Sequence, residues 1–206
     1  MKKLSNAFTT LLFAASLGSL TVCLNGCFEE TSTHRPAFDY SQPQVEDEFQ
    51  KGADRPPTTK TLYTLAMVLV NQGRDAHAEA ILQRLISEYP EFIPAYNSLA
   101  ELKMRQRRID QAIETLNKGL NVSPEDPVLV NNRGMCWMIR QDYPKALEDF
   151  TRAAGLMPQN ARYRANMAVA LAFLGRDEEA LSLYKQILPQ DKAKHNLSII
   201  QRARQR

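Results

Sequence analysis

Apolar and polar residues follow a helical period over most of the chain. Between residues 59 and about 192, apolar side chains recur three and four positions apart, as on the buried face of an amphipathic helix. The segments 95–106 and 109–120, for example, predict two helices joined by a short turn. From residue 28 to about residue 58 this period is lost. The pattern therefore predicts an all-α region that follows a segment without a core of its own.

The helical region repeats itself every 34 residues. Pro90, Pro124 and Pro158 are separated by this interval. Two further positions of each period hold small residues and two hold bulky ones, with Lys103 as one exception. A fixed period of this length indicates a stacked repeat architecture. The in-phase sets are Ala66, Ala100, Gly134 and Ala168; Ala78, Ala112, Ala146 and Ala180; Leu82, Leu116, Phe150 and Tyr184; and Leu69, Lys103, Trp137 and Leu171.

A 34-residue period with these residue types resembles the tetratricopeptide repeat (TPR). The resemblance implies an all-α, right-handed α-solenoid of four helix pairs, at 59–92, 93–126, 127–160 and 161–192. Each unit would end its second helix near the recurring proline, which cannot continue a helix. The amphipathic segment 193–206 is expected to form a capping helix that covers the last unit and presents a polar outer face.

Two kinds of small residue have a structural role in this scheme. Gly134 and Ala146 are expected to let paired helices approach closely, because a larger side chain there would overpack the contact. Gly73 and Gly175 are expected to end helices, because glycine accepts the positive φ of a helix C-terminus.

The first 26 residues have the pattern of a secretion signal. Lys2 and Lys3 precede an uncharged apolar stretch that is short and diluted with Thr and Ser, which disfavours a transmembrane helix. The segment ends in Leu24-Asn25-Gly26-Cys27, which resembles a bacterial lipobox. That resemblance implies cleavage before Cys27, lipid attachment to Cys27, and export to a membrane. With Phe28 rather than Asp after the cysteine, the outer membrane is the expected location if the host has two membranes.

Alternatives to the lipoprotein interpretation stay open. Cys23 is a rival attachment site, although Val22 would be a poor residue at the cut. The leader could also be an ordinary signal peptide or an uncleaved anchor. Residues 27–58 carry more acids than bases and little apolar surface, so we expect a tether, with at most one short helix near 45–50.

Composition excludes several classes of function. Lys and Arg total 26 against 23 Asp and Glu, and removal of Lys2 and Lys3 leaves 24 against 23, so no strong basic footprint for nucleic acid remains. No metal-ligand spacing, phosphate-binding glycine loop or nucleophile motif appears, and we expect neither an enzyme nor a cofactor. Cys136 would be the one thiol left and is expected to be buried.

The TPR resemblance implies which residues line a concave groove. Amides and hydroxyls at the fifth and sixth positions of the units would hydrogen-bond the main chain of a partner peptide. Apolar side chains beside them, several of them the adaptable Met, would anchor a segment or helix. The alternative is that the Met side chains pack between helices. The predicted groove residues are Thr64, Met67, Asn97, Ser98, Met104, Asn131, Asn132, Met135, Met138, Asn166 and Phe173.

The C-terminal region resembles the TadD-type lipoproteins of Tad/Flp pilus assembly. The similar features are Gly175-Arg176, Leu188-Pro189 and Ala193-Lys194-His195-Asn196-Leu197. This resemblance implies a scaffold that binds pilus or secretin components. The alternatives are a general envelope adaptor for a protease or an outer-membrane assembly complex, and, from another class, an accessory module of an envelope enzyme. The oligomeric state is left open.

Overall fold

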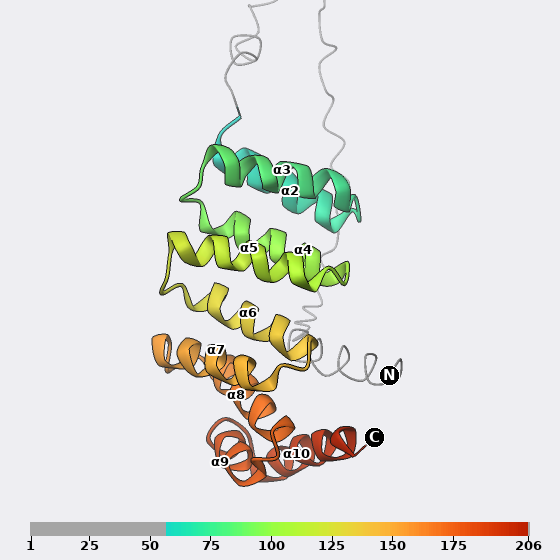
Figure 1. Ribbon diagram of the computed structural model, residues 1–206, viewed down its shortest axis with the longest axis vertical. Coiled ribbons are helices and arrows are strands. Elements are labelled where there is room, and N and C mark those ends of the chain that lie inside the picture. Colours follow the sequence, from blue (N-terminus) through green and yellow to red (C-terminus); the bar gives the residue numbers. More distant parts are fainter. Residues whose placement is uncertain (1–56, 206) are drawn as a thin grey trace, which may run out of the picture. The chain divides into compact units, whose positions relative to one another are not determined.

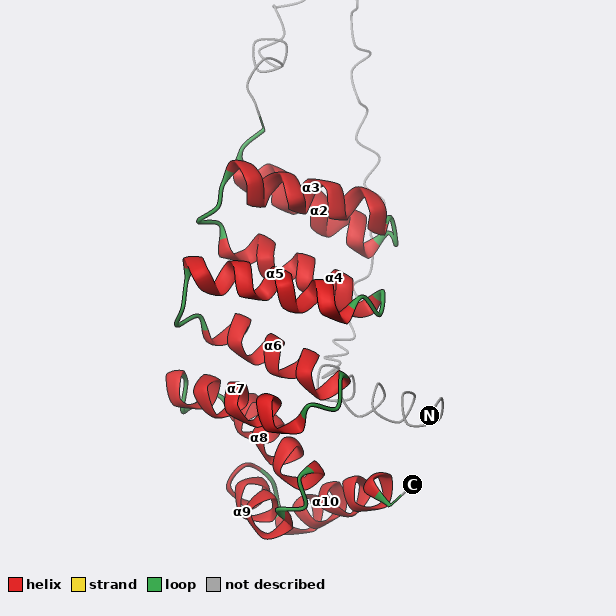
Figure 2. Cartoon of the chain, in the orientation of Figure 1, coloured by secondary structure: helices red, strands yellow, loops and turns green. Residues whose placement is uncertain are grey.

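The computed structural model describes residues 57–205, and this part of the chain is helical throughout apart from short turns (Figure 2). The leader, Cys27 and almost all of the predicted tether lie outside the described residues. No helix within 57–205 is both long and apolar enough to cross a membrane. The helices are α2 (Thr59–Asn71), α3 (Asp75–Glu88), α4 (Ile93–Arg105), α5 (Ile109–Val122), α6 (Pro127–Ile139), α7 (Tyr143–Leu156), α8 (Ala161–Phe173), α9 (Asp177–Ile187) and α10 (Gln190–Arg204).

The helices pack in the order in which the chain forms them. Helices α2 and α3, α4 and α5, α6 and α7, and α8 and α9 are the four pairs, and each pair also contacts the next (Figure 1). Helix α4 additionally contacts α6, so first helices of neighbouring units touch directly. This sequential packing confirms the predicted all-α solenoid of four pairs and a closing helix.

Small residues bring the paired helices together as predicted. Gly134 on α6 lies so close to α7 that an added Cβ would be 2.7 Å from the ring of Phe150. Ala146, on the facing side of α7, is completely buried. Phe150 is also completely buried, so the ring has no free space into which it could move. The third unit therefore depends on the absence of a side chain at position 134.

The turn inside each unit has a residue in the left-handed conformation at the same position of the repeat. Gly73 and Gly175 have φ of 71° and 81°, and the corresponding Arg107 and Gln141 have φ of 63° and 62°. These four positions are 34 residues apart. In each turn the residue after the left-handed one donates its backbone N–H to the carbonyl five residues earlier, which closes a Schellman motif. The glycines were predicted, whereas the strained Arg107 and Gln141 were not.

Helix α10 covers the end of the array. Its buried Ala193, Leu197 and Ile200 pack with α8 and α9. The helix begins at Gln190, three residues before the predicted boundary, because Pro189 follows the end of α9 and starts the next helix. Near its other end, Arg204 donates to the Ala172 carbonyl and to both carboxylate oxygens of Asp177, over 2.6 to 3.0 Å.

Candidate functional site: an amide ladder on the first helices

The predicted amides lie on consecutive first helices, with Asn97 on α4, Asn131 and Asn132 on α6, and Asn166 on α8. Each of these helices is held in place by its paired helix and by its neighbours along the array. All four amides are half-buried, so their side chains lie at the surface of the helix layer and not inside the core. We call this set, together with Glu101 on α4, the amide ladder.

Hydrogen bonds join the amides across units. Nδ2 of Asn132 donates to Oδ1 of Asn97, and Nδ2 of Asn166 donates to Oδ1 of Asn131 at 2.8 Å. Both bonds connect the fifth position of one unit to the sixth position of the next, 35 residues later. Within α6, Nδ2 of Asn131 donates to Oδ1 of Asn132 at 3.1 Å and so joins the two bonds into one chain.

The ladder has a direction. Donation runs from Asn166 to Asn131, on to Asn132 and to Asn97, and ends at the Glu101 carboxylate. Hydrogen bonds aligned in one direction polarise one another. Each of the side-chain amides of Asn97, Asn131 and Asn166 keeps one N–H that has no partner within residues 57–205. The side-chain oxygen Oδ1 of Asn166 also has no partner there. An external main chain could therefore still bind along the ladder without breaking it.

A contact with the same 35-residue offset also joins the first two units, but it is made by two hydroxyl groups and not by amides. The hydroxyls of Tyr63 and Ser98 are 2.9 Å apart. Ser98 is buried, so it secures α2 to α4 and is not available to a partner as predicted. Thr64 is exposed on α2. The predicted polar column is therefore accessible at Thr64 and along the ladder, but not at Ser98.

The predicted apolar residues divide into two groups. Met67, Met104 and Met135 are half-buried and keep part of their surface exposed. Met138 is 2% exposed, so it packs inside the array, as the alternative interpretation held for some of the Met residues. Phe173 is stacked on Tyr143 with ring centroids 4.8 Å apart.

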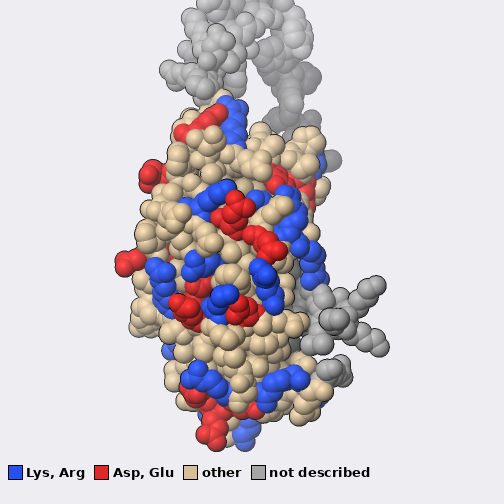
Figure 3. Space-filling view, viewed as in Figure 1, with Lys and Arg blue, Asp and Glu red and all other residues tan. Residues whose placement is uncertain are grey.

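Contacts 30 residues apart fix each unit against the next. Asp75 at the start of α3 accepts from Arg105 at the end of α4 at 2.8 Å, and Asp110 on α5 accepts from Arg140 after α6 at 2.6 Å. The Tyr143–Phe173 stack is the third contact with this spacing. Positive and negative side chains are interspersed over the face in Figure 3, which agrees with such local pairing.

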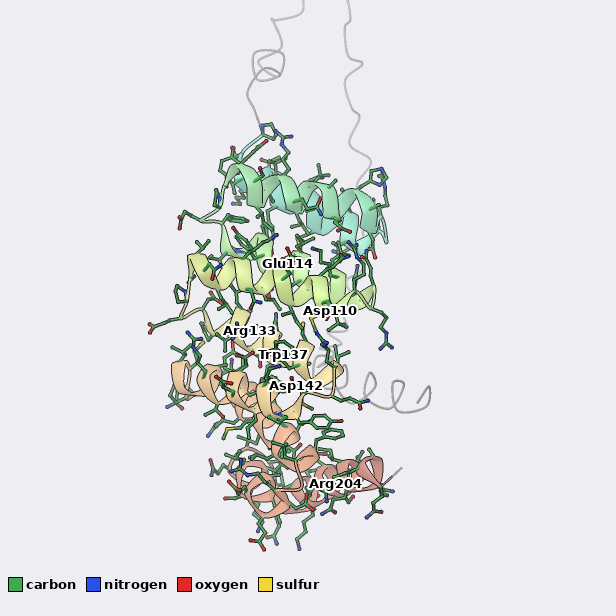
Figure 4. All side chains as sticks on the ribbon, viewed as in Figure 1. Asp110, Glu114, Arg133, Trp137, Asp142 and Arg204 are labelled. Atoms are coloured by element: carbon green, nitrogen blue, oxygen red, sulfur yellow. The ribbon has the colours of Figure 1, made fainter. Side chains whose placement is uncertain are left out.

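An ion pair that the sequence analysis missed lies in the third unit. Arg133 lies on α6 (Figure 4). It donates from Nε and Nη2 to the two carboxylate oxygens of Asp149 on α7, at 2.9 and 2.7 Å, and from Nη1 to Asn117 on α5 at 2.9 Å. The hydrogen bond to Asp149 raises the pKa of Arg133. The sequence did contain one sign of this ion pair, because Arg133 is a charged residue at a position where the other units have the apolar Leu65, Leu99 and Met167.

The remaining candidate residues are structural. Tyr96 is buried. Trp137 is half-buried, with the Lys145 ammonium 4.6 Å from its ring centroid. Lys103, the exception in the bulky set, donates to Thr115 Oγ1 at 2.9 Å, and burial lowers its pKa. Burial raises the pKa of the Cys136 thiol to about 12. No group of three or more potential metal ligands occurs among the described residues.

Comparison with known proteins agrees with this architecture. A model of the tetratricopeptide repeat matches residues 77–131 and 138–198, and a second model of the same repeat matches residues 60–91. This chain belongs to the tetratricopeptide repeat family. The TPR fold is a scaffold for binding proteins or peptides, and the ladder lies on the first helices of this TPR array.

Individual proteins and solved structures are similar to this chain. The human protein O-mannosyl-transferase TMTC1 is 26% identical over 77% of this chain, and this chain spans about a fifth (19%) of that relative. The crystal structure of YrrB, described as a TPR protein with an unusual peptide-binding site, has a TM-score of 0.61 and 19% identity, covering 75% of this chain and 82% of YrrB. The thermophilic TPR protein TTC0263 of Thermus thermophilus has a TM-score of 0.59 and 22% identity, covering 75% of this chain and 86% of TTC0263.

Proposed function

We propose that this TPR protein is a non-catalytic scaffold that holds a segment of a partner protein along the amide ladder. The observation that carries the proposal is the row of spare amide N–H groups on α4, α6 and α8, beside the partly exposed Met67, Met104 and Met135. Amides can bind the main chain of many sequences, and Met adapts to varied apolar anchors. The arrangement suits a partner segment that is extended or helical.

We further propose that the scaffold is anchored to a bacterial membrane through lipids on Cys27. The support is the sequence Leu24-Asn25-Gly26-Cys27 after an apolar leader. Several acyl chains, each contributing about 0.8 kcal/mol per buried methylene, would make the attachment stable. Incorporation of radiolabelled palmitate tests this anchor: the label should disappear in Cys27→Ser, and label that persists in that variant contradicts it.

Within this proposal, assembly of a Tad/Flp-type pilus is the specific role supported by the sequence around Leu188-Pro189 and Ala193–Leu197. A general envelope adaptor for a protease or an outer-membrane assembly complex is the alternative. Neighbouring genes distinguish the two: genes for a secretin, a secretion ATPase and a prepilin favour the pilus role, and their absence favours the general adaptor.

A pull-down comparison tests the ladder as the binding surface. The Asn132→Ala/Asn166→Ala double variant removes the donors of both cross-unit amide bonds, and it should recover less partner than the wild type. The matched control is Asn121→Ala on α5, an exposed amide away from the ladder, which should leave partner recovery unchanged. Equal recovery by the double variant, at equal thermal stability, contradicts the proposed binding surface.

A further inference from the structure

The amide ladder ends in a carboxylate that has a distinct environment. Glu101 is exposed and occupies the ninth position of the second unit, where the other units have the apolar Met67, Met135 and Val169. It is therefore the single acid in that row of the first helices. Its position between Met67 and Met135 along the array places one negative charge between two apolar, flexible side chains.

Two amides hold the carboxylate by one of its oxygens. Oε1 of Glu101 accepts from Nδ2 of Asn97 at 3.0 Å and from Nδ2 of Asn132 at 3.3 Å. The second oxygen, Oε2, has no hydrogen-bond or ion-pair partner among residues 57–205. A carboxylate fixed in this way loses little further side-chain freedom when a cation binds to its free oxygen.

The cation on the same face of α4 as Glu101 is occupied elsewhere. Arg105 lies one turn further along α4, at the i+4 position at which Glu and Arg commonly pair. Its guanidinium instead donates to Asp75 Oδ1 on α3 at 2.8 Å. The described part of the chain therefore leaves the negative charge of Glu101 without a positive partner.

We propose that Glu101 selects a partner segment that carries a Lys or Arg side chain at the point where it crosses α4. The cation would bind Oε2 of Glu101, and its alkyl stem would contact Met67 or Met135, since long basic side chains lay their methylenes along apolar surface. This inference rests on the proposed function, because it assigns the side-chain preference of the same ladder. Main-chain bonds to the amides would position the segment, and Glu101 would discriminate among sequences.

Selection from a displayed library of random 12-residue peptides tests this preference on the full chain. The wild-type protein is expected to enrich peptides with one Lys or Arg flanked by apolar residues. The affinity of enriched peptides for Glu101→Gln is expected to fall about 3- to 10-fold, since a charge-assisted hydrogen bond becomes a neutral one. Gln can still accept the N–H groups of Asn97 and Asn132, so the ladder is kept. Glu125→Gln is the matched control, because it removes one exposed charge away from the ladder.

The outcomes of the selection distinguish failure of the Glu101 preference from failure of the proposed binding function. Basic enrichment that is lost with Glu101→Gln and kept with Glu125→Gln supports the inference. Peptides whose binding requires Asn131 and Asn166 but shows no basic preference, or the same preference in Glu101→Gln, overturn it and leave the proposed function standing. Failure to enrich peptides, or binding that is insensitive to Asn131→Ala/Asn166→Ala, overturns both.

Discussion

Nδ2 of Asn166 donates a 2.8 Å hydrogen bond to Oδ1 of Asn131, a residue that lies on another helix and 35 positions earlier. The Asn132–Asn97 bond and the Tyr63–Ser98 contact have the same offset. The offset exceeds the repeat period by one residue, so the bonds run diagonally from each first helix to the next. The surface that we assign to partner binding is thus part of what joins the units.

Replacement of Gly134 by Ala is expected to destabilise the fold by about 1–3 kcal/mol, the usual cost of overpacking. The added Cβ would be 2.7 Å from the Phe150 ring and 3.2 Å from Cβ of Asp149. Urea-induced unfolding measures the effect. Gly155→Ala is the matched control, since nothing lies within 4 Å of a Cβ there, and it should leave stability unchanged or raise it by up to about 1 kcal/mol. Equal stability of both variants would contradict the close approach of α6 and α7.

Arg107→Gly and Gln141→Gly are each expected to stabilise the protein by about 0.5–1 kcal/mol. Both residues have φ above 60°, where a side chain is strained, and the gain is reduced by the greater freedom of glycine in the unfolded chain. Thermal unfolding should show a higher Tm. Gln106→Gly, at a neighbouring residue with φ of −77°, should lower Tm instead. A lower Tm in all three variants means that the left-handed turns are not strained.

Asp149→Asn is expected to destabilise the protein by roughly 2–4 kcal/mol, because Arg133 would keep its largely buried guanidinium without a charged partner. The side chain of Asp149 is 5% exposed and that of Arg133 is 23% exposed, so water replaces the lost contact poorly. The Arg133→Met/Asp149→Leu double variant should recover most of this loss. Additive losses for the two single changes in a double-mutant cycle would show that the two side chains do not interact.

Cys136 is expected to react slowly with a thiol reagent at pH 8 in the native protein and rapidly after unfolding, in a background of Cys23→Ser and Cys27→Ser. Burial raises its pKa from 9.0 to about 12, which favours the neutral thiol in the folded state. Because the folded protein holds the Cys136 proton more tightly than the unfolded chain, the contribution of this thiol to the free energy of unfolding is complete below pH 9. It is lost as the pH rises toward 12. Rapid labelling of the native protein at pH 8 would disprove burial of this thiol.

The repeat period was sufficient to predict the helix pairs, because it reflects packing that recurs identically in every unit. Features that depend on one unit alone were harder to predict. Gly73 and Gly175 marked two turns, but Arg107 and Gln141 have the same φ because the flanking helices impose it. The Arg133–Asp149 pair joins residues whose partnership depends on how α6 meets α7.

The site was predicted in part. Its amides could be placed on one face from their positions in the units, whereas Glu101 was missed because a single acid in a row of apolar residues forms no motif. The sequence could not show that Asn97 and Asn132 bond to each other, since the diagonal offset between α4 and α6 arises from tertiary packing. Lipid attachment to Cys27 and the pilus role stay predictions.

Photo-crosslinking in living cells tests the central claim most directly, because it captures a partner whose identity is still unknown. A benzophenone amino acid would replace Thr64 or Met135 on the first helices and, as matched controls, the exposed Lys118 or Glu148 on the second helices. We expect adducts with a partner protein from positions 64 and 135 and few from 118 and 148. Adducts from the second helices alone, at equal protein levels, would contradict binding along the amide ladder.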